Sequence, residues 1–170
     1  KWKQLNGLTS VDYSLTQLNT IRNNNTNTIT EQAGSIFTNE GKCTSGDYID
    51  TVYQIDYIKS QITLAILGLF LTNESVPLDD TGIPQVEGEI RGVLDRMGAL
   101  GIIAALTDER NDDDKAKSDS GVYMFKVSVP KRSDLSATDL SNRKLTGVTF
   151  SYVIAGAIHE TVINGTLRID

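Results

Sequence analysis

The sequence predicts an α+β fold in which a mixed or antiparallel sheet packs against two main helices. Two long stretches, about 50–73 and 83–98, carry apolar residues at steps of three or four, the spacing of a helix with one buried face. Short segments elsewhere are β-branched or alternate polar with apolar residues, which is typical of strands. Shorter helices near 14–24 and 137–144 complete the prediction.

The helix near 14–24 has a recognisable start and end. Ser14 stands three residues before Gln17, which is the spacing of a capping box. An apolar stripe follows, and the asparagine run at 23–25 is expected to end the helix.

The other N-terminal elements are expected to be short strands over 2–5, 28–30 and 35–38. Asn6-Gly7 is expected to form the turn after the first of them, because this dipeptide accepts positive φ. Gly34 is expected to mark a bulge between the second and the third.

The long helix at 50–73 changes character along its length. Its first half is amphipathic, whereas leucines cover the other side as well toward its end, so this end is expected to lie inside the domain. The longest apolar run, Ile62 to Leu71, is about half of the roughly 20 residues that cross a bilayer. We therefore expect a core helix and no membrane span.

The second main helix, 83–98, has Pro84 in its first turn, where a missing N–H costs little, and Gly98 at its end. The segment 107–121 has Ala116 as its single apolar residue and many acidic ones, so we expect a solvated surface loop. Serines before residue 137 are suited to cap the short helix that begins there.

Strand patterns dominate the second half of the chain and cover 100–106, 122–129, 148–155, 157–163 and 166–169. The Asn164-Gly165 pair between the last two strands suits a tight hairpin. The last strand is also short enough to leave the domain and pair with another chain, and both arrangements stay open.

The composition argues against several kinds of function. A formal charge of −6 and a pI of about 4.8 oppose DNA or RNA binding, which requires clustered lysine and arginine. A single cysteine, Cys43, rules out an internal disulfide and a multi-thiolate zinc site. The motifs of phosphate, dinucleotide, esterase and metalloprotease sites are absent, and we expect no cofactor, no metal and no catalytic residue.

The enzymatic alternative depends on few residues. His159, the single histidine, would have to act as the base for Cys43, and neither lies in a motif of a cysteine enzyme. The run 112–114 lacks the spacing and the final glutamate of an EF-hand calcium loop. We expect a chain that is not an enzyme, and we keep as the alternative a small α+β ligand-binding or enzymatic domain that uses His159 or the acidic loop.

Several short turn and cap patterns follow one another along nearly the whole chain, at 5–9, 15–17, 41–50, 155–159 and 163–166. Between them, Val76 to Ile83 contains the pattern P-x-x-D-x-G-I ahead of a helix. In the order and spacing of these patterns, the chain resembles the C-terminal domain of a contractile phage tail sheath protein, or of the sheath of a tail-derived bacteriocin particle.

The resemblance implies a structural subunit that assembles with copies of itself around a tail tube. It implies a place in the virion tail, which is assembled in the cytoplasm of the bacterial host. Nucleic acid and membrane are not expected partners. Residues 1–170 are then a single domain and a fragment of a longer sheath-like protein, and the fragment is expected to be monomeric by itself.

The resemblance also implies that terminal strands are exchanged between neighbouring subunits. The candidate for the exchanged strand, and hence for the subunit interface, consists of Thr166, Leu167, Arg168, Ile169 and Asp170. Residues 157–163 are expected to belong to the receiving sheet.

Overall fold

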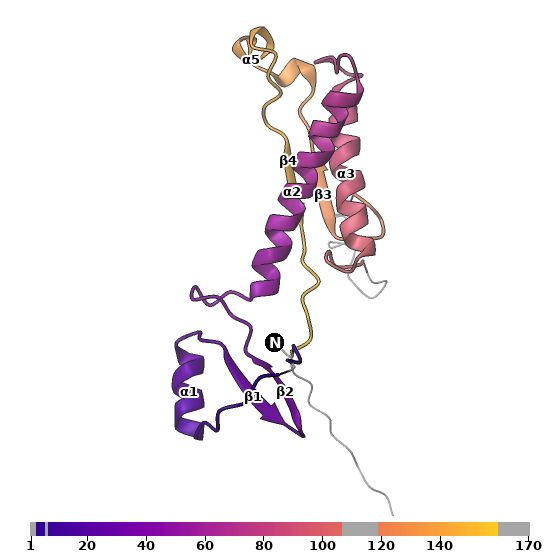
Figure 1. The fold of residues 1–170 in the computed structure, drawn as a ribbon. Coiled ribbons are helices and arrows are strands. Elements are labelled where there is room, and N and C mark those ends of the chain that lie inside the picture. Colours follow the sequence, from indigo (N-terminus) through magenta and orange to yellow (C-terminus); the bar gives the residue numbers. More distant parts are fainter. Residues whose placement is uncertain (1–2, 6, 107–118, 160–170) are drawn as a thin grey trace, which may run out of the picture. The chain divides into compact units, whose positions relative to one another are not determined.

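The computed structural model describes residues 3–5, 7–106 and 119–159 and shows an α+β fold (Figure 1). The chain divides into two compact units. The hairpin unit comprises Lys1–Tyr53 and Ala157–Asp170, and the helical unit comprises Gln54–Gly156. The long helix α2, Ile49–Thr72, contributes its first residues to the hairpin unit and the others to the helical unit. That the two units form a single domain stays a prediction.

The first helix of the hairpin unit, α1, spans Leu15–Asn23 and has the predicted start and end. The Ser14 hydroxyl accepts a hydrogen bond from the Gln17 N–H at 3.3 Å. The Gln17 side-chain oxygen accepts one from the Ser14 N–H at 2.9 Å. Both halves of the capping box are therefore confirmed, and Asn24 in the asparagine run forms the C-cap.

An antiparallel hairpin follows, made of β1, Thr28–Gln32, and β2, Ser35–Asn39. Its register leaves Ala33-Gly34 as a two-residue turn, in which both residues have positive φ, 52° and 75°. The prediction of a bulge at Gly34 is therefore wrong. A two-residue turn with positive φ at both positions matches the right-handed twist of the strands, and glycine adopts this conformation without strain.

The helical unit contains most of α2, the whole of α3, Ile83–Ala99, and two antiparallel strands. The strands are β3, Phe125–Ser128, and β4, Thr149–Tyr152. A 3-10 turn and the short helix α5, Ala137–Ser141, lie between them in sequence. The two main helices are confirmed close to the predicted bounds, and α5 begins where predicted and ends before residue 144.

The described residues contain two separate two-stranded sheets, whereas the sequence predicted one sheet. The segment 100–106 accounts for part of this difference. Its first residues close the end of α3, since Gly101 has a φ of 73° and donates its N–H to the Gly98 carbonyl oxygen at 2.9 Å. The residues after this turn form isolated bridges to segments next to β3 and β4 instead of a regular strand.

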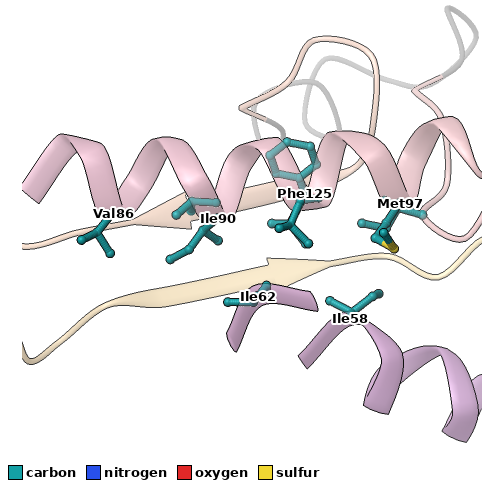
Figure 2. Packing of buried hydrophobic residues seen from close by; sticks show 10 residues of the cluster. Ile58, Ile62, Val86, Ile90, Met97 and Phe125 are labelled. Carbon is teal, nitrogen blue, oxygen red and sulfur yellow. The ribbon is translucent and has the colours of Figure 1, made fainter. Parts of the chain in front are cut away.

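One hydrophobic core holds the helical unit together. Figure 2 shows Ile58 and Ile62 of α2 facing a row of α3 side chains, with Phe125 of β3 beside them. The other buried members of the cluster are Val86, Ile90, Val93, Leu94, Met97, Ile103 and Val127. Because burying one large apolar side chain contributes about 1.5–3 kcal/mol, this cluster is the main source of stability in the unit.

The prediction that the end of α2 lies inside the domain is wrong. Leu64, Leu67, Phe70 and Leu71 are 57%, 50%, 53% and 76% exposed. We call these four residues the outer face of α2. The core of the helical unit covers one side of the helix, and the apolar outer face lies on another. By length and composition, α2 is also apolar enough to cross a membrane.

A carboxylate shapes the connection between α2 and α3. Asp79 Oδ1 accepts hydrogen bonds from the Thr81 hydroxyl, from the Thr81 N–H at 2.8 Å and from the Gly82 N–H at 3.1 Å. The hydrogen bond from the Thr81 hydroxyl, and after it the two backbone N–H bonds, hold the pKa of Asp79 below its ordinary value of 3.8. A Cβ at Gly82 would overlap the Pro77 carbonyl oxygen, so the tight turn requires glycine there.

Gly98→Ala is expected to destabilise the helical unit by roughly 1–3 kcal/mol, because the added Cβ would overlap the Tyr123 ring. Gly88→Ala is the matched control on the same helix. Among the described atoms nothing lies within 4 Å of its added Cβ, so alanine is expected to raise stability by up to about 1 kcal/mol. Chemical denaturation followed by circular dichroism measures both, and equal effects would contradict this packing.

Asp79→Asn is expected to destabilise the start of α3 at pH 7 and to have less effect in acid. Because folding lowers the pKa of Asp79, its stabilising effect is fully present well above the ordinary value of 3.8 and is lost as the pH falls through the folded value. The difference in unfolding free energy between wild type and variant should therefore shrink below about pH 4. Asp80→Asn, at the exposed next position, is the control. A difference for Asp79→Asn that does not change with pH would show that the charge of the Asp79 carboxylate does not stabilise this turn.

Candidate assembly surfaces

The β1–β2 hairpin has two edges, and the N-terminal segment occupies the edge of β2. The Leu5 N–H donates to the Ile36 carbonyl oxygen, and the Thr38 N–H donates to the Lys3 carbonyl oxygen, each at 3.0 Å. The predicted strand over 2–5 is thus reduced, in its described residues, to a bridge and two flanking backbone bonds on β2.

The other edge, that of β1, pairs with no strand among the described residues. In the register of the hairpin, Ile29 pairs with Thr38 and Glu31 pairs with Ile36. Thr38 and Ile36 direct their backbone groups away from β1, so the alternation of an antiparallel pair makes Ile29 and Glu31 direct theirs away from β2. Among the described residues, no backbone hydrogen bond from another segment reaches Ile29 or Glu31 on that side. Their N–H and C=O groups therefore face outward along one edge.

The predicted subunit interface, Thr166 to Asp170, lies outside the described residues, as does the Asn164-Gly165 turn. The predicted strand over 157–163 is described only to residue 159, and that part has no regular secondary structure. The sequence pattern did not single out β1 as a receiving strand. Alternating residues indicate a strand, but they do not indicate which of its edges is paired.

His159 lines an apolar hollow of about 790 Å³ in the hairpin unit, together with Ile49, Asp50 and Tyr53 among others. Its ring meets the Tyr48 ring edge to face, with the two centroids 4.5 Å apart. Such a pair is one of the preferred arrangements of aromatic side chains. An aromatic ring is therefore one of the groups that His159 contacts.

Cys43 is not among the described residues that line this hollow. Its N–H donates to the Asp47 carbonyl oxygen at 2.7 Å, and its carbonyl oxygen accepts from the Gly46 N–H at 2.9 Å, so it forms part of a tight turn. The lining of the hollow includes a histidine and a carboxylate but lacks the thiol nucleophile that the cysteine alternative requires.

The acidic segment is described only from Asp119 onward. Asp119 Oδ2 accepts hydrogen bonds from the Val127 N–H at 2.8 Å and from the Arg91 guanidinium at 3.2 Å. This last aspartate is therefore an anchor between α3 and β3, where the sequence predicted a solvated loop residue. No group of three or more potential metal ligands occurs in the part of the chain that the structure describes.

Comparison with known proteins identifies the family. None of the curated proteins compared with the chain matches it. A family profile described as "E217 tail sheath protein gp31-like, C-terminal domain" matches residues 49–167. The match begins at the first residue of α2 and includes α3, β3 and β4, whereas the hairpin precedes it. Because the profile covers more than half of the chain, this chain belongs to the family of tail sheath C-terminal domains.

Proposed function

We propose that this domain links neighbouring subunits of a contractile tail sheath around a tail tube by exchanging strands between them. Membership of the sheath family supports a structural role, and a non-enzymatic one. The observation that carries the finer proposal is the open edge of β1. A strand edge with outward N–H and C=O groups is a template for a strand from another chain.

The incoming strand in this proposal is the C-terminal segment of a neighbouring copy, Thr166 to Asp170, in which polar and apolar residues alternate. Ile29 and Glu31 each offer it one donor and one acceptor. A backbone hydrogen bond contributes about 0.5–1.5 kcal/mol net, so one strand forms a weak link. Many such links in one assembly act together and hold it firmly.

Strand exchange suits a sheath that shortens. Paired strands stay hydrogen-bonded while the bodies that they connect rotate as rigid units. The energy of contraction then comes from larger interfaces in the relaxed assembly, with no need for nucleotide hydrolysis. The assembly belongs to the virion tail and forms in the host cytoplasm, and residues 1–170 serve in it as a single domain.

Glu31→Pro in the protein at its full natural length is expected to reduce the yield of assembled sheath roughly tenfold. Proline removes the outward N–H of residue 31 and places a ring on the edge, but it leaves the bonds between β1 and β2 intact. Electron microscopy and sedimentation of the assemblies measure the yield.

Glu31→Ala is the matched control for this variant. The Glu31 carboxylate accepts a hydrogen bond from the Ser10 hydroxyl at 2.9 Å, and alanine removes that bond while it keeps the backbone N–H. Alanine is therefore expected to assemble like the wild type. If Glu31→Pro gives a normal yield of assembled sheath, β1 is not the strand that receives the exchanged segment.

Deletion of residues 165–170 from the same full-length protein is expected to leave a folded subunit that does not form sheaths, because the incoming strand is missing. Circular dichroism checks folding, and electron microscopy checks assembly. If the deletion variant forms sheaths at normal yield, the C-terminal strand is not the exchanged one. If the deletion variant forms sheaths at normal yield while Glu31→Pro does not, another segment pairs with β1.

A further inference from the structure

We infer that the outer face of α2, formed by Leu64, Leu67, Phe70 and Leu71, packs against a second copy of this chain in the assembled state. The inference rests on the proposed self-assembly and adds a second contact to the strand link. It starts from the exposure of these side chains, each of which has half or more of its surface in contact with solvent.

The outer face is a continuous stripe and not a set of scattered residues. Leu64, Leu67 and Leu71 follow steps of three and four, which place them on one side of the helix, and Phe70 extends that side. Ile58 and Ile62, by contrast, belong to the buried core cluster. The sequence therefore makes α2 apolar on a side that the described part of its own chain does not cover.

The chemistry of this face restricts its partner. From Ser60 to Thr72 the helix has no charged residue, so the face offers nothing to a charged surface or to nucleic acid. At about 1.5 Å per residue this uncharged part is roughly 20 Å long, which is short of the roughly 30 Å of a hydrocarbon core. An apolar protein surface fits it better than a bilayer does.

The size of the face indicates when it is covered. At roughly 100 Å² for each half-exposed large side chain, the four residues present a few hundred Å². A stable interface buries about 800 Å² on each partner, so this face alone does not hold two free copies together. This agrees with the expectation that the isolated 170-residue chain is monomeric.

A strand link between two copies makes this small apolar contact sufficient. Once two copies are joined through a strand, the effective concentration of one near the other reaches the millimolar range, and a weak apolar contact becomes an intramolecular one. The neighbours in a sheath are other copies of the subunit, and the matched sheath domain includes the whole of α2. A second copy is therefore the occupant that an assembly supplies next to this face.

Labelling with a maleimide reagent tests the inference. In the full-length protein with Cys43→Ser, the variant Leu67→Cys introduces a thiol on the outer face, and Gln85→Cys introduces one at an exposed position of α3. Sheaths assembled from the subunit alone, without tube protein, are compared with unassembled subunits. We expect assembly to slow labelling of Leu67→Cys at least tenfold and to leave Gln85→Cys unchanged.

Other outcomes overturn the inference. Equal labelling of Leu67→Cys before and after assembly shows an uncovered face. Protection that needs the tube protein assigns the face to the tube, and protection of the unassembled subunit assigns it to another segment of the same chain. If the thiol of the unassembled Leu67→Cys subunit is protected only when phospholipid vesicles are added, the outer face of α2 binds a membrane.

Electron microscopy of the same samples separates this inference from the proposed function. If the wild-type subunit forms no assemblies, either alone or with tube protein, the proposed function fails. If assemblies form and Leu67→Cys stays reactive in them, only the inference about α2 fails. If Leu67→Cys folds but does not assemble while Gln85→Cys does, the face is required for assembly and the inference is supported.

Discussion

The helical unit depends on one hydrophobic core to which α2, α3 and β3 all contribute buried side chains. Ile58 and Ile62 supply the α2 part of the core, and Phe125 joins it from β3. Ile58 and Ile62 are the buried residues of α2, so this helix joins the core through one side only. The exposed leucines follow from this one-sided contact. The sequence makes both sides of α2 apolar, and the described residues cover only one of them.

Local patterns were reliable where the interaction is local. The capping box at Ser14 and the bounds of α3 follow from contacts between residues a few positions apart, and both were predicted. Predictions failed where a distant segment decides the outcome. Whether leucines late in α2 are buried depends on what packs there, and whether Asp119 is solvated depends on Arg91 and the Val127 N–H.

The same distinction applies to the candidate assembly surfaces. The P-x-x-D-x-G-I pattern marked the connection ahead of α3, but the carboxylate that holds this turn belongs to Asp79 and not to Asp80 of the pattern.

The family resemblance was sufficient to assign the chain to the tail sheath C-terminal domains. It did not identify β1 as the open edge, because the pairing of β2 with the N-terminal segment is a contact across more than thirty residues, as in Thr38 to Lys3.

The two proposed contacts differ in what they demand of a neighbour. A strand link uses backbone groups, which every residue except proline provides in full, so its specificity comes mainly from register and from the alternation of side chains. An apolar helix face has no register of its own. Its contribution to the free energy of association is roughly proportional to the apolar area that it buries. Under these two proposals, the strand link keeps subunits of a shortening assembly connected while they turn, and the helix contact depends on how closely they approach. A subunit that uses both can favour the more compact arrangement without losing its neighbours, and neither contact requires a cofactor or a chemical step.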